Sequence, residues 1–134
     1  MENFKQVIAI IIIIIVIIIA DIILEKNTNS TIEIVSEKLE LVDEKVEKFE
    51  SDNVSKLELK KEVNKMVDIW KEKQKILTYY IEHDEIEKIS DKIELIRKQI
   101  EIEEFGDARQ AIEETKFLLD HLKEKEKLNL RNIL

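Results

Sequence analysis

The feature that most constrains this chain is an apolar run near its N-terminus. Residues 7–20 are all apolar, and Asp21 is followed by Ile22, Ile23 and Leu24. An α-helix rises about 1.5 Å per residue, so residues 7–24 extend roughly 27 Å, close to the thickness of bilayer hydrocarbon. The run predicts one transmembrane helix over residues 7–24, after a short N-terminal tail over residues 1–6.

A cleaved secretory signal and a buried core helix are the two alternatives to a span. Signals usually have shorter apolar regions that end in small residues, whereas this run ends in Ile18-Ile19-Ala20-Asp21. A helix in a soluble core needs a polar face, and no polar residue precedes Asp21 within the run. We therefore interpret the run as an uncleaved, lipid-facing signal anchor. Asp21 then marks the membrane interface, rather than a functional carboxylate inside the membrane.

The residues around the run predict its orientation. A tail of six residues before a first span usually stays in the cytoplasm, and Lys5 lies in that tail. On the other side, the nearest basic residues are Lys26 and Lys38. We expect a single-pass plasma-membrane protein with a cytoplasmic N-terminus and an extracytoplasmic C-terminal domain. The opposite orientation remains an alternative.

The rest of the chain is acidic and rich in both kinds of charge. The whole chain has a formal net charge of −8, and residues 1–24 contribute −1 through Glu2, Lys5 and Asp21, which leaves −7 for the remainder. An acidic surface repels nucleic acid, so we expect no nucleic-acid partner. The chain has no Cys, no Pro and one Gly. This composition excludes disulfides, thiol nucleophiles, cysteine zinc sites and glycine-rich phosphate loops.

Apolar residues recur at spacings of three and four beyond the anchor, which is typical of helices with heptad-like seams. The fold class is predicted to be all-α: one N-terminal transmembrane helix, a linker over residues 25–30 and a small antiparallel helical bundle over residues 31–134. Its helices are expected at about 31–50, 54–82, 85–104 and 108–123. The predicted seams comprise Ile32, Val35, Leu39, Val42, Val46 and Phe49; Leu59, Val63, Val67, Trp70, Leu77 and Ile81; Ile86, Ile89, Ile93, Ile96 and Ile100; and Ala108, Ala111, Thr115, Leu118 and Leu122, widened by Ile112 and Leu119.

Capping and turn residues set the expected helix boundaries. Ser30 with Glu33, and Asp84 with Glu87, have the spacing of capping boxes. Residues 51–53 are turn formers, and the sole glycine, Gly106, is predicted to end the third helix in the left-handed conformation. The closing LNLRNIL is too apolar for a free terminus, so we expect this tail to dock on the bundle.

Two residues of the second helix interrupt its simple pattern. Trp70 lies in register with the apolar seam, so we interpret it as a core residue rather than part of a ligand pocket. Gln74 falls on the same seam, and we interpret it as a register-setting or half-exposed core residue.

One constellation supports a chemical hypothesis. His83, Asp84 and Glu85 lie at one predicted turn, and Asp120, His121 and Glu124 lie near the end of the last helix; imidazoles with carboxylates can bind zinc. In an antiparallel pair, however, His121 is expected level with a residue near Asp91, roughly 10 Å short of His83. Histidines that border helices also interact favourably with free carbonyls and the helix dipole. We therefore predict no catalytic residue, no cofactor and no metal, and retain His83, Asp84 and His121 as the metal candidates.

Several strings resemble a known family. They are WKEKQKIL from Trp70, IEHDEIEKI over residues 81–89, DARQAIEETKFLLDHL over residues 107–122 and the terminal NIL. Together they resemble an uncharacterised bacterial family of short membrane-anchored helical proteins, domain of unknown function 4363, over nearly the whole chain and its N-terminal span. Where that family leads us to expect a second tryptophan, near residues 52–53, this chain has Val54. The resemblance implies an anchored helical protein without an assigned activity.

These observations favour a noncatalytic extracytoplasmic interaction or accessory module. Its expected partners are the membrane and either another protein or further copies of the chain, because an anchored helical bundle offers surfaces for association. A cytoplasm-facing coiled-coil regulator and a His/carboxylate metal-binding sensor are the alternatives.

Overall fold

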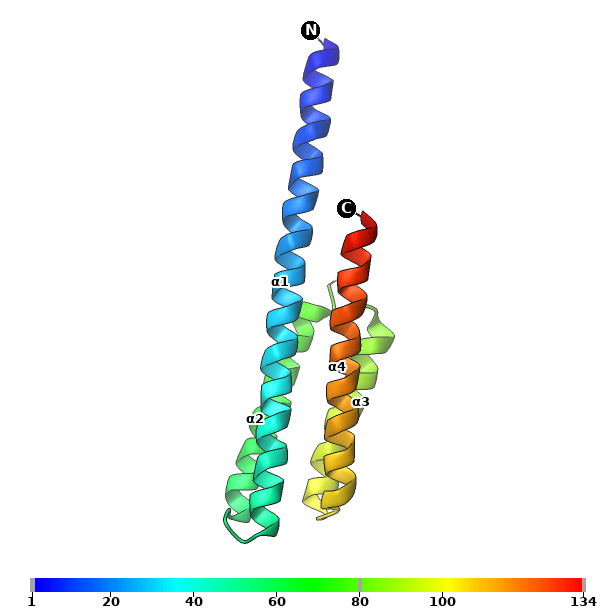
Figure 1. The fold of residues 1–134 in the computed structure, drawn as a ribbon. Helices are drawn as coiled ribbons and strands as arrows, with labels where there is room; N and C mark the ends of the chain where they lie inside the picture. Colours follow the sequence, from blue (N-terminus) through cyan, green and yellow to red (C-terminus); the bar gives the residue numbers. More distant parts are fainter. Residues whose placement is uncertain (1, 80, 134) are drawn as a thin grey trace.

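The fold is a four-helix bundle with one greatly extended helix (Figure 1). The computed structural model describes residues 2–79 and 81–133, and from residue 126 onward it describes the side chain of Lys127 alone. The helices are α1 (Glu2–Glu50), α2 (Lys56–Leu77), α3 (His83–Glu101) and α4 (Phe105–Ile133), and the described residues contain no strand. The predicted all-helical class is confirmed.

Helix α1 is unbroken from Glu2 to Glu50, and its N-terminal part extends alone beyond the bundle (Figure 1). It contains the one stretch among the described residues that is long and apolar enough to cross a membrane. No described segment covers that stretch: Ile12 and Ile14, for example, are 55% and 50% exposed. The molecule therefore has an uncovered apolar rod at one end and a packed bundle at the other.

The linker predicted over residues 25–30 is wrong, because these residues form part of α1. The Ser30–Glu33 capping box is likewise absent, since both residues lie inside the helix. Polar residues continue the inward face here: Thr28 and Thr31 are buried, and the Thr28 hydroxyl donates to the carbonyl of Leu24 at 2.8 Å. These polar residues mark the place where α1 enters the bundle, and they do not mark the end of a helix.

The four helices form a ring of neighbours. Helix α1 packs against α2 and α4, α3 packs against α4, and the closure between α2 and α3 is the least close. Across the described residues, no Cα atoms of the diagonal pairs α1–α3 and α2–α4 approach within 8 Å. Side chains fill the centre, and the predicted seams supply nearly all of them; the exceptions are Phe49 and Leu118, which are partly buried, and Met66, which is buried without having been predicted.

Two turns end their helices with the same hydrogen bonds. Asp52 and Glu103 both have φ 62°, and each is followed by a residue whose N–H bonds five residues back: Asn53 to Lys48 at 2.8 Å and Glu104 to Gln99 at 2.8 Å. These are Schellman caps with an acidic residue in the left-handed position. The cap predicted at Gly106 is wrong. Helix α4 already begins at Phe105, whose ring packs edge-on against Phe49 with the ring centroids 5.2 Å apart.

The remaining boundaries differ by a few residues from those predicted. Helix α2 starts after Ser55, whose hydroxyl accepts from the N–H of Glu58 at 3.2 Å, and it ends at Leu77 rather than at residue 82. Ile81 is buried even though it lies between helices. Asp84 is in the first turn of α3 and does not cap it.

Helix α4 continues to Ile133, so the residues predicted as a separate tail extend this helix. Whether their side chains dock on the bundle lies outside the described residues.

Candidate functional site

A polar network links α2 to α3 inside the bundle. The indole N–H of Trp70 donates to the Ser90 hydroxyl at 2.8 Å, and that hydroxyl donates to the side-chain oxygen of Gln74 at 2.9 Å. Trp70 is 2% exposed, and Gln74 is half-buried. The predictions for both residues are confirmed, whereas the role of Ser90 was missed. The network is a structural connection, because the Trp70 N–H, the Ser90 hydroxyl and the Gln74 side-chain oxygen are satisfied by one another.

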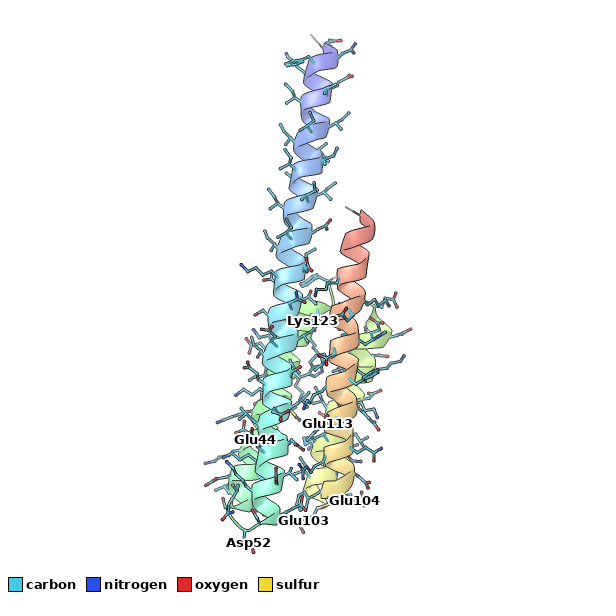
Figure 2. The ribbon with its side chains drawn as sticks, in the orientation of Figure 1. Glu44, Asp52, Glu103, Glu104, Glu113 and Lys123 are labelled. Atoms are coloured by element: carbon cyan, nitrogen blue, oxygen red, sulfur yellow. The ribbon has the colours of Figure 1, made fainter. Side chains whose placement is uncertain are left out.

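Ion pairs join α1 to α4 at regular steps. Glu33 pairs with Lys123 at 3.9 Å, and Glu47 pairs with Arg109 at 3.8 Å. Glu40 and Lys116 pair between them, so each step of seven residues along α1 matches a step of seven back along α4. We call these contacts, with Asp43–Arg109, the α1–α4 ladder. Figure 2 shows Lys123 on α4 beside α1.

Asp43 and Arg109 form the doubly hydrogen-bonded contact of the ladder. The Nε and Nη2 atoms of Arg109 donate to the two carboxylate oxygens of Asp43 at 2.9 and 3.4 Å. The hydrogen bond and charge of Asp43 raise the pKa of Arg109 above its ordinary value. In the same way, the hydrogen bond from Lys116 to Glu40 raises the pKa of Lys116. Both cations stay charged at neutral pH, so the ladder holds α1 and α4 in one register.

A cleft of about 220 Å³ opens at the end of the bundle away from the apolar rod. It lies where the start of α2 passes the end of α3, the least closely packed pair. The side chains of Phe49, Leu59, Val63, Ile100 and Phe105 form its apolar part, and Lys56, Lys60, Asn64, Arg97, Glu101 and Glu103 form its polar part. Most of these charges neutralise one another: Lys56 pairs with Glu103 at 3.6 Å, and Arg97 pairs with Glu101 at 3.9 Å. The cleft has room for a small apolar group.

A second concave surface runs along the outside of the bundle between α3 and α4. Its residues include the exposed Phe117 and Leu95 and the half-buried Leu118, and an ion pair between Lys92 and Glu114 crosses it. The hydrogen bond from Lys92 is the main cause that lowers the pKa of Glu114 below its ordinary value. This surface is more apolar than the cleft.

The metal candidates all lie toward the end of the bundle that is nearer the rod, but they do not form one cluster. The Nε2 atom of His83 is 3.0 Å from a carboxylate oxygen of Glu87, one turn along α3, and its side chain is 77% exposed. Asp84 is exposed in the first turn of α3, where a carboxylate interacts favourably with the helix dipole. His121 lines the outer surface between α3 and α4 beside Glu85 and Ile89. Among the described residues, no group of three or more His, Cys, Asp and Glu is placed to hold a metal ion.

The predicted level of His121 is wrong. It was expected opposite Asp91, but it lies beside Glu85 and Ile89, closer to the start of α3. The reason is the turn: the reversal is centred at Glu103 rather than at Gly106, so every residue of α4 moves toward the beginning of α3.

The fold and its surfaces define a helical bundle built on a long N-terminal helix that is a candidate membrane span. The chain belongs to the family described as "Domain of unknown function (DUF4363)", whose model matches residues 22–133. This match confirms the resemblance seen in the sequence, and it begins just after Asp21, so most of the apolar run lies outside it. Searches among curated proteins and among solved structures returned no match.

Proposed function

We propose that this protein is a single-pass membrane protein whose bundle is a noncatalytic interaction module held outside the cytoplasm. The observation that carries the proposal is the continuity of α1. One helix begins as an uncovered apolar rod and ends as a quarter of the bundle core. Anything that holds the rod therefore also holds the bundle.

The cost of leaving the rod in water supports a lipid environment for it. Burying an apolar side chain of this size is worth about 1.5 kcal/mol or more, so the uncovered run represents on the order of 20 kcal/mol. A whole domain is usually stable by only about 5–15 kcal/mol. Bilayer hydrocarbon covers such a helix all round, and its length fits residues 7–24.

Surface features support interaction rather than chemistry. The pKa values of Arg109 and Lys116 are raised and that of Glu114 is lowered, and all three groups belong to ion pairs between helices. The distal cleft has mostly paired charges, and the outer surface between α3 and α4 exposes an aromatic side chain. Exposed apolar patches of this kind are typical of protein–protein contacts.

Cysteine labelling of intact cells tests the orientation, because the natural chain has no cysteine. Glu2→Cys and Ser30→Cys place a single exposed thiol on either side of the apolar run. We expect a membrane-impermeant maleimide to label Ser30→Cys in intact cells and to label Glu2→Cys only after permeabilisation. The reverse pattern would replace this proposal with a cytoplasm-facing regulator.

Cross-linked pull-down of the tagged full-length protein from membranes tests the interaction module. We expect recovery of a specific protein partner or of further copies of the chain. Extraction of the protein by alkaline carbonate would contradict membrane insertion. Stoichiometric metal in the purified protein, lost in the double variant His83→Ala/His121→Ala, would favour the metal-binding sensor instead.

A further inference from the structure

The outer surface between α3 and α4 is one continuous groove along the bundle. We call it the α3–α4 groove; it is lined by Lys88, Lys92, Leu95, Glu113, Phe117 and Leu118. Three adjoining hollows make it up, and Leu118 lines all three. No described segment of the chain fills it.

The groove presents apolar side chains together. Phe117 is 71% exposed, Leu95 is 40% exposed, and Leu118 lies half-buried beside them. A single exposed apolar residue is ordinary, but an aromatic side chain grouped with two leucines in a hollow is typical of an interface. The groove therefore has the apolar centre that a docked partner would cover.

Beside Leu95 and Phe117, the two walls of the groove carry opposite charges. There the α3 wall has Lys88 and Lys92 with Asp91 between them, a net charge of +1, and the α4 wall has Glu113 and Glu114. Glu85 also lines the groove nearer the start of α3, where it pairs with Lys125 at 2.8 Å. The ion pair of Lys92 with Glu114 within the chain shows that these charges lie at the same level along the bundle. A partner that places acidic groups on α3 and basic groups on α4 at that level would complement both walls.

We propose that the partner in this groove is a second copy of the chain, related by a twofold axis parallel to the bundle. Such an axis keeps every residue at its level and places α3 of one copy against α4 of the other. Lys92 of each copy then faces the acidic wall of the partner, and the two Phe117 side chains meet near the axis. A twofold axis across the bundle would instead place α3 against α3 and oppose like charges.

The parallel arrangement agrees with the rod. Both copies of α1 leave the dimer in the same direction, so both enter one membrane; this step rests on the proposed membrane anchoring. Confinement to one membrane also raises the effective concentration of each copy for the other.

Single-cysteine cross-linking of the full-length protein in membranes tests the arrangement. Gln110→Cys and His121→Cys place thiols toward the two ends of the groove, and Glu44→Cys is an exposed control on α1 (Figure 2). With a short bis-maleimide we expect Gln110→Cys and His121→Cys each to give a dimer with itself, and Glu44→Cys to give none. Mixed cross-links between Gln110→Cys and His121→Cys without self-cross-links would overturn the parallel axis.

A charge exchange tests the pairing across the walls. We introduce Lys92→Glu in one tagged His121→Cys chain and Glu113→Lys in another. Alone, each variant opposes like charges at both symmetric contacts, so its cross-linked fraction should fall about tenfold. When the two chains are co-expressed, both contacts become complementary, and a mixed dimer should return. The emission of buried Trp70 should stay unchanged, which reports that the bundle remains folded.

The outcomes separate the dimer from the anchoring on which it rests. Carbonate-resistant protein without self-cross-links would overturn the dimer and leave anchoring intact, and carbonate-extracted protein would overturn anchoring itself. Equal cross-linking at Glu44→Cys, loss of both homodimers without a mixed dimer, or occupation of the groove only by a different protein would also overturn the proposal.

Discussion

At the scale of single residues, Ser90 decides whether the polar groups between α2 and α3 are satisfied. Its hydroxyl accepts a hydrogen bond from Trp70 and donates one to Gln74. One small side chain therefore satisfies a polar group on each of two residues of α2. Among the described residues, the side chains of Trp70 and Gln74 make no other hydrogen bond. A buried polar group that loses its partner costs more than the bond itself gains.

Replacing Ser90 by Ala should therefore destabilise the bundle by about 2 kcal/mol, because the Trp70 N–H and the Gln74 oxygen would both be left unpaired. Urea unfolding of the full chain in detergent, followed by Trp70 fluorescence, measures the change. Ser30→Ala is the matched control: Ser30 is exposed within α1, and its replacement should alter stability by less than about 0.5 kcal/mol. Equal effects of the two substitutions would remove the network from the list of stabilising features.

Glu103 is the second residue whose conformation makes a definite prediction. Its φ of 62° is in the left-handed region, which costs a residue with a side chain roughly 1 kcal/mol relative to glycine. Glu103→Gly should stabilise the protein by up to about 1 kcal/mol, since its exposed pair with Lys56 contributes little. Thermal unfolding measured by circular dichroism tests this. Glu101→Gly, in the last turn of α3, should instead destabilise by about 1 kcal/mol. A lower melting temperature for Glu103→Gly would contradict the argument.

These two residues also show what the sequence could not reveal. Gly106 is the natural choice for a left-handed cap, but the contact of Phe105 with Phe49 starts α4 earlier and moves the cap to Glu103. Ser90 belongs to no periodic pattern in the sequence, and its role depends on which residues of α2 lie opposite it in the fold. By contrast, the five isoleucines predicted for the α3 seam are all buried, because periodicity alone determines that face.

At the scale of helices, the α1–α4 ladder fixes how the two longest elements are aligned. Charged residues at seven-residue spacing are visible in the sequence on both helices, but their pairing requires knowing that α1 and α4 are neighbours. A shift of one heptad would preserve the apolar seams and would still pair Glu33 with Lys116 and Glu40 with Arg109, because both helices repeat every seven residues. The same shift would separate Asp43 from Arg109, so this contact is the part of the ladder that specifies the register.

A double-mutant cycle at Asp43 and Arg109 measures this contribution. The Asp43 side chain is 16% exposed and accepts two hydrogen bonds, so we expect a coupling energy of about 1 kcal/mol between Asp43→Ala and Arg109→Ala. The same cycle at Lys56 and Glu103, a more exposed pair 3.6 Å apart, should give a coupling close to zero. Urea unfolding at low and high salt provides the values. Equal couplings at the two pairs would show that the ladder has no special role.

The continuity of α1 makes a separate prediction at the former linker. Asn29→Pro should destabilise the protein by about 3 kcal/mol, because proline removes a helical hydrogen bond and clashes with the preceding turn. A flexible linker would tolerate the same change. Lys56→Pro is the control, since it follows the cap Ser55 at the first position of α2, where proline is accepted. Circular dichroism melting in detergent distinguishes the two. A harmless Asn29→Pro would restore the predicted linker.

At the scale of the whole molecule, the ladder also determines how far α4 reaches. From the pair Glu33–Lys123, ten residues further along α4 bring Ile133 level with about Ile23 of α1, where the apolar run ends. Figure 1 shows the C-terminal end of α4 beside α1 at the same end as the rod. The sequence predicted an anchor and a bundle as separate parts, but in the structure α1 joins them without a break and α4 returns to the junction.

The position of Trp70 turns this arrangement into a test of what covers the rod. The ion pair of Lys45 with Glu58 aligns α1 with α2, so Trp70 lies level with about Glu33, roughly 14 Å beyond Leu24. In vesicles with brominated acyl chains, the emission of Trp70 should persist. Ile14→Trp adds a tryptophan within the rod, and its added emission should be quenched, because lipid tails replace the missing protein contacts around Ile14. Glu44→Trp, exposed on the bundle, should not be quenched. An unquenched Ile14→Trp would mean that protein, rather than lipid, surrounds the apolar half of α1.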